Sequence, residues 1–96
     1  MFRVTLLVTN GPPITVEVLP GATLLRAVVR ARMPIGRSCR GVGICAACRV
    51  FVVEGSVAPM DAVEAALAAR EPLAEHERYA CRARVIGDVT VTTAYW

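Results

Sequence analysis

The sequence predicts a mixed α+β fold, and two observations predict it. Runs of β-branched and apolar residues stand near both ends of the chain, and such runs favour strands. Two segments between them instead repeat apolar residues at helical spacing. The chain has 96 residues, which suffices for one buried core. We therefore expect a single domain over residues 1–96, with its elements in the order ββ, α, loop, β, α, ββ.

The first two segments are expected to form a hairpin. Residues 2–9 are mostly apolar or β-branched, and a Gly-Pro-Pro stretch at 11–13 stops the run. In the next segment, Ile14, Val16 and Val18 alternate with Thr15, Glu17 and Leu19. A turn rich in Gly and Pro between two such runs is typical of a β-hairpin.

A first helix is expected from an N-cap at Thr23 to about Arg32. From residue 37 to 48 the periodicity stops and Gly, Ala, Ser and Cys dominate, which indicates a loop. The buried stripe of the helix is expected to contain the apolar residues that recur at helical spacing, Leu24, Leu25, Val28 and Val29.

A strand is expected at residues 49–53, with a turn at residues 54–55. Asp61 followed by Glu64 matches a capping box, so a second, Ala-rich helix begins there and ends before Pro72. It is expected to pack through Val63, Ala66 and Leu67.

The last β-pair is expected from residues 81–86 and 89–93, which flank Gly87-Asp88. His76 stands among charged residues, and we expect it at the solvated surface.

The charge of the chain is small in total but uneven. The formal net charge is +3, too mild for a nucleic-acid partner. Up to residue 48 the only acid is Glu17, whereas five acids stand against Arg70 alone between residues 61 and 77. No apolar stretch approaches the ~20 residues of a membrane span, and the N-terminus is a poor signal peptide. We expect a cytoplasmic monomer with no membrane partner.

Four cysteines carry the chemistry of the sequence. Five residues separate Cys39 from Cys45, two separate Cys45 from Cys48, and 32 separate Cys48 from Cys81. An intracellular chain rarely uses such cysteines for disulfides. Three thiols on one turn-rich loop and a fourth from a distant segment suit a compact inorganic core.

This arrangement resembles the cluster-binding signature of the [2Fe–2S] ferredoxin family. The resemblance rests on residues 37–50, RSCRGVGICAACRV, and residues 78–81, RYAC. It implies a β-grasp fold, a mixed sheet with one main helix packed across it and a second short helix. It also implies a [2Fe–2S] cluster held by Cys39, Cys45, Cys48 and Cys81. The first spacing is closer to adrenodoxin-like and bacterial ferredoxins than to the plant type, which has four residues there.

The resemblance further implies a one-electron carrier, not an enzyme. Its partners would be a ferredoxin reductase and an acceptor such as a cytochrome P450 or another oxygenase. The acidic segment 61–77 lies where adrenodoxin-like ferredoxins carry an acidic docking helix, although a solvated helix face would look the same. We also hypothesise that the arginines beside the cysteines raise the cluster's reduction potential, namely Arg37, Arg40, Arg49 and Arg82.

Two alternatives remain open. One is an accessory Fe–S module that reductively activates a cofactor enzyme. The other is an interaction domain with a structural zinc bound by four cysteines, although zinc ribbons normally use two closely spaced cysteine pairs and this chain has one. A Rieske cluster needs two His ligands, and His76 is the only one.

Overall fold

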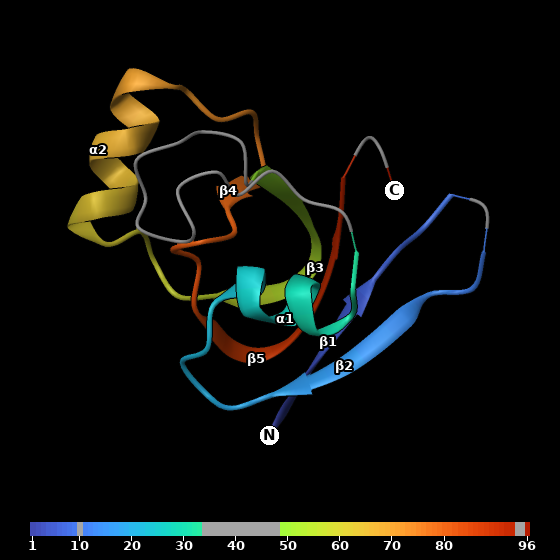
Figure 1. The fold of residues 1–96 in the computed structure, drawn as a ribbon. Coiled ribbons are helices and arrows are strands. Elements are labelled where there is room, and N and C mark those ends of the chain that lie inside the picture. Colours follow the sequence, from blue (N-terminus) through green and yellow to red (C-terminus); the bar gives the residue numbers. More distant parts are fainter. Residues whose placement is uncertain (10, 34–48, 94–95) are drawn as a thin grey trace.

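The computed structural model describes residues 1–9, 11–33, 49–93 and 96 (Figure 1). Within them lie a five-stranded mixed sheet, in the order β2-β1-β5-β3-β4, and two helices. This confirms the predicted α+β class. The elements are β1 (Phe2–Leu6), β2 (Ile14–Val18), α1 (Leu24–Arg30), β3 (Arg49–Val57), α2 (Ala62–Arg70), β4 (Glu77–Tyr79) and β5 (Val85–Thr92).

The predicted N-terminal hairpin is present, with both strands shorter than expected. β1 and β2 pair antiparallel, from Phe2 opposite Val18 to Leu6 opposite Ile14. On its other side β1 pairs in parallel with β5, where Val4 lies opposite Val89. Strand β5 therefore lies in the middle of the sheet, between β1 and β3.

Helix α1 begins where the sequence predicts, because the Thr23 hydroxyl accepts a hydrogen bond from the Arg26 amide at 3.3 Å. It ends at Arg30, two residues early. The predicted stripe is wrong at one position: Val29 is 40% exposed and Ala27 is buried instead. Residues 24, 27 and 28 lie on the face of the helix that packs on the sheet. Residue 29 lies beyond the edge of that buried face.

The predicted turn at Glu54–Gly55 is wrong, because β3 continues to Val57. Its pairing with β5 shifts register on each side of these residues, so the glycine belongs to an irregularity in the ladder. Gly55 has a φ of 89°, and a Cβ there would lie 2.2 Å from the carbonyl oxygen of Asp88. Close approach of β5 therefore requires glycine at this position.

The predicted C-terminal β-pair is also wrong. Residues 85–92 form one strand that runs straight through Gly87-Asp88. Both edges of this strand are already occupied, by β1 on one side and β3 on the other. The segment before it contains a turn at residues 80–82 and an isolated bridge from Arg84 to Thr23, and it does not pair with β5.

No helix in the described ranges is long and apolar enough to cross a membrane. The hydrophobic core lies between α1 and the sheet. Its fully buried side chains come from all the described elements except β2, and include Val4, Leu6, Leu24, Val28, Val50, Leu67, Tyr79, Val85 and Val91.

Candidate functional site

Cys81 is the one predicted ligand that the structure describes. It follows β4 by two residues, in the turn that leads to β5, and is 3% exposed. Cys39, Cys45 and Cys48 lie outside the described residues. The four-cysteine ligand set therefore stays a prediction, and the geometry of the site is that of the Cys81 segment, residues 78–83.

On one side the Cys81 segment is bonded to the start of α1. The Leu25 amide donates to the carbonyl of Ala80 at 2.9 Å, and the Leu24 amide donates to the carbonyl of Ala83 at 2.8 Å. First-turn amides of a helix have no hydrogen-bond acceptor inside the helix. These two bonds therefore give the first amides of α1 their acceptors, and they hold the chain on both sides of Cys81.

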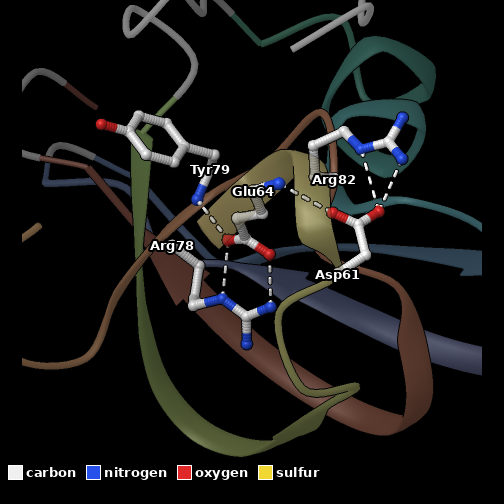
Figure 2. A network of polar contacts seen from close by, with 5 residues as sticks. All are labelled: Asp61, Glu64, Arg78, Tyr79 and Arg82. Carbon is white, nitrogen blue, oxygen red and sulfur yellow. Dashed lines mark hydrogen bonds and ion pairs between the residues drawn. The ribbon is translucent and has the colours of Figure 1, made fainter. Parts of the chain in front are cut away.

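On the other side a buried carboxylate of α2 holds the same segment (Figure 2). Glu64, fully buried, accepts from Nε and Nη2 of Arg78 at 2.7 and 2.6 Å. Its Oε2 also accepts from the Tyr79 amide at 3.1 Å. Such a charge-assisted, two-pronged pair is directional and fixes the Arg78 backbone relative to the helix. The Tyr79 hydroxyl completes the attachment by donating to the carbonyl of Glu71.

Asp61 makes a second link between α2 and the Cys81 segment (Figure 2). It caps α2 by accepting from the Glu64 amide at 2.7 Å. Its other oxygen accepts from Nη2 and Nε of Arg82 at 2.6 and 3.1 Å. The bond from Arg82, and after it the bond from the Glu64 amide, lower the pKa of the Asp61 carboxyl below its ordinary value.

The capping box predicted for α2 is therefore half formed. Asp61 caps as expected, but the Glu64 side chain is drawn to Arg78. The predicted packing of α2 is wrong for two of three residues: Val63 and Ala66 are exposed, and Leu67 is buried beside Glu64. The sequence weakly indicates that Glu64 and Leu67 share the buried face, since they are three residues apart on one side of the helix.

Cys81 opens on a hollow whose described lining also contains Thr23, Leu25, Arg26, Val29, Arg30 and Arg82. Acidic side chains are absent from that lining, and arginines stabilise the thiolate form that a metal ligand must take. A buried thiol in basic surroundings, on a segment fixed from two sides, suits a cluster with a net negative charge. Within the described residues no three Cys, His, Asp or Glu side chains form a metal site of their own.

His76 lies at the surface as predicted, with 73% of its side chain exposed and a φ of 64°. Its Nε2 atom lies 3.5 Å from the Glu75 carboxylate. It lies outside the Cys81 segment, and its carbonyl accepts from the Val52 amide of β3 at 2.8 Å.

Comparison with known proteins adds the cofactor. A family model described as a 2Fe-2S iron-sulfur cluster binding domain matches residues 7–85. No curated protein sequence matches the chain.

Solved structures are similar over nearly the whole chain. An ISC-like [2Fe–2S] ferredoxin from Pseudomonas putida is 26% identical, with a TM-score of 0.80, over 100% of this chain and 94% of that one. A reduced putidaredoxin variant from the same organism is 22% identical, with a TM-score of 0.74, over 95% and 94%. The Amycolatopsis cytochrome P450 reductase GcoB is 35% identical, with a TM-score of 0.72, over 98% of this chain and 26% of that one.

Proposed function

The chain belongs to the family of [2Fe–2S] iron–sulfur cluster binding domains, and from this premise we propose that it carries single electrons between a ferredoxin reductase and an oxidising partner. A cytochrome P450 or another oxygenase is the acceptor we propose. The 35% identity to a part of a cytochrome P450 reductase supports a place in this kind of electron-transfer chain. The family match also favours a cluster over the four-cysteine zinc site considered from the sequence.

We propose Cys39, Cys45, Cys48 and Cys81 as the cluster ligands. The observation that carries the proposal is Cys81, buried within the matched range and held from both sides. When bound, the cluster takes up and releases one electron at a time. The chain's own part is to hold four thiolates in place, to keep water from Cys81 and to present the site to a partner.

The proposed effect of the neighbouring arginines on the reduction potential differs among them. Arg82 is paired with Asp61, so the positive charge it presents to the cluster is largely cancelled. Arg49 is exposed and its charge is screened by water and salt. We therefore expect a smaller potential shift when both members of the pair are neutralised, in Asp61→Asn/Arg82→Gln, than an unpaired arginine beside a ligand would give, because Arg82→Gln alone leaves the Asp61 charge uncompensated.

We further propose that residues 1–96 act as one cytoplasmic, monomeric domain with no catalytic site of its own. Substrate chemistry then takes place on the partner, and this chain contributes only the electron.

Anaerobic purification followed by iron and sulfide analysis tests the proposal. We expect about two iron and two acid-labile sulfide per chain, and a one-electron change on reduction. Each single Cys→Ser variant of the four should lose the cluster or change its spectrum, while the exposed-site variant Ser56→Ala should retain it. A colourless, zinc-containing protein would contradict the proposal.

A further inference from the structure

We propose that the exposed face of α1 is a docking surface for an acidic redox protein. We call it the basic face and define it by Arg26, Arg30 and Arg84. The inference rests on the proposed electron-carrier function, and it assigns a negative charge to the surface of the partner that docks.

The basic face is hollowed in two places that meet at α1. One hollow opens beside Cys81, and its described lining includes Leu25 and Val29. The other lies over the turn from β2 into α1, and its lining includes Leu19 and Arg84. Thr23, Arg26 and Arg30 line both. The basic face is therefore continuous with the opening at the predicted cluster ligand.

The arginines of the basic face lack carboxylate partners. All eight acidic residues of the chain lie in the described ranges. The ion pairs found there are Arg78–Glu64 and Arg82–Asp61, and His76 lies beside Glu75; none of these contacts includes the three arginines. Arg84 does donate to the carbonyl of Gly21 at 2.9 Å, which holds its guanidinium over the second hollow. The described linings contain no acid.

Aliphatic side chains lie exposed among these arginines. Leu19 is 66% exposed and Val29 is 40% exposed. Exposed aliphatic side chains together with arginines are typical of protein–protein contact surfaces, in which arginine is enriched. A small anion would use the arginines alone and would leave the aliphatic groups in water. The composition therefore favours a protein partner.

The acidic segment competes poorly for this role. Of its five acids, Asp61 and Glu64 are paired with Arg82 and Arg78. Three acids remain, and one of them, Glu75, lies beside His76. The acidic docking helix implied by the resemblance is thus largely neutralised at its start, whereas the basic face keeps its charge next to Cys81.

The test compares two double variants of the cluster-loaded protein. Arg26→Gln/Arg30→Gln removes two charges from the basic face. Arg3→Gln/Arg70→Gln removes two exposed charges that line neither hollow. An acidic flavodoxin serves as the protein probe and the anion [Co(EDTA)]⁻ as the small probe. Binding to flavodoxin is measured by thermophoresis, and electron transfer by stopped-flow absorbance.

At about 10 mM ionic strength we expect Arg26→Gln/Arg30→Gln to slow transfer to flavodoxin about three- to tenfold and to weaken binding similarly, with the difference vanishing near ~0.5 M salt. Arg3→Gln/Arg70→Gln should change both by less than about twofold. Iron content and midpoint potential are measured for both variants, so that rates are compared per loaded cluster and at equal driving force.

Equal slowing by both double variants would overturn the inference, because net charge alone would then explain it. Loss of rate with [Co(EDTA)]⁻ but not with flavodoxin would overturn it in favour of a small-anion site. Failure of the electron-carrier proposal is visible earlier and separately, as an unmodified protein without a reducible cluster.

Discussion

Helix α1 packs on the sheet through Leu24, Ala27 and Val28, whereas helix α2 buries one leucine, Leu67, and one carboxylate, Glu64. Both helices hold the Cys81 segment, α1 through its first amides and α2 through two acids. Apolar packing is largely indifferent to pH and salt, while ion pairs are not. One flank of the predicted ligand should therefore respond little to pH and ionic strength, and the other flank should respond to both.

The largest effect on the α2 flank is expected from Glu64→Ala. It leaves the Arg78 guanidinium and the Tyr79 amide without their acceptor, and breaking a buried pair costs about 3–5 kcal/mol. Urea unfolding of the variant should show a loss of this size in the free energy of unfolding. Glu75→Ala, at a side chain that is 89% exposed, is the matched control and should lose less than about 0.5 kcal/mol.

A double variant separates the value of the pair from the cost of an orphaned charge. Glu64→Leu/Arg78→Leu should be more stable than Glu64→Leu alone, because it leaves no unpaired guanidinium. A double variant less stable than both single ones would show instead that α2 needs the polar contacts themselves.

The second largest effect is expected in the sheet, from Gly55→Ala. The added Cβ would meet the backbone of Asp88 at 2.2 Å and of Val89 at 2.8 Å, and we expect a loss of about 2–3 kcal/mol in the free energy of unfolding. The loss should be the same at pH 4 and pH 7, since no charge is involved. Gly87→Ala, where nothing lies within 4 Å, is the control and should be near neutral; an equal loss there would argue against the close contact.

The smallest effect is expected from Asp61→Asn, and it should depend on pH. The pKa of Asp61 is lowered in the folded chain, chiefly by Arg82. Its contribution to stability is therefore present above the ordinary carboxyl pKa of about 3.9 and is lost as the pH falls through the folded value. Asparagine keeps the cap but not the charge.

Thermal unfolding of Asp61→Asn should show a lower Tm than the unmodified chain at pH 7, with the gap closing below about pH 4. In an Arg82→Gln background, the Tm difference caused by Asp61→Asn should be smaller over the same pH range. A gap that stays constant down to pH 2 would mean that the Asp61–Arg82 pair adds nothing.

Local signals predicted the parts of the fold that depend on near neighbours. Thr23 and Asp61 cap their helices because each carries its own acceptor next to the amides it serves. The first hairpin follows from two strand-forming runs around a Gly/Pro turn. These features need no knowledge of the rest of the chain.

The errors at Gly55 and Glu64 involve distant partners. Gly55 signals a turn until the Asp88 carbonyl is placed beside it. Glu64 signals a capping box until Arg78, 14 residues later, claims its carboxylate. At the candidate site the cysteine spacing predicted which thiols to consider, but the two-sided hold on Cys81 comes from contacts that no short motif encodes.

The central position of β5 has a consequence for how the protein is made. Both β1 and β3 pair with this strand, which is the last of the sheet to be translated. While the ribosome is still adding residues 85–92, β1 and β3 lack the strand that each of them pairs with in the middle of the sheet. All four cysteines, ending at Cys81, have by then been translated. Cluster loading on a finished fold therefore has to wait until residues 85–92 have been made, and the thiols translated before them need protection from oxidation until that strand is in place.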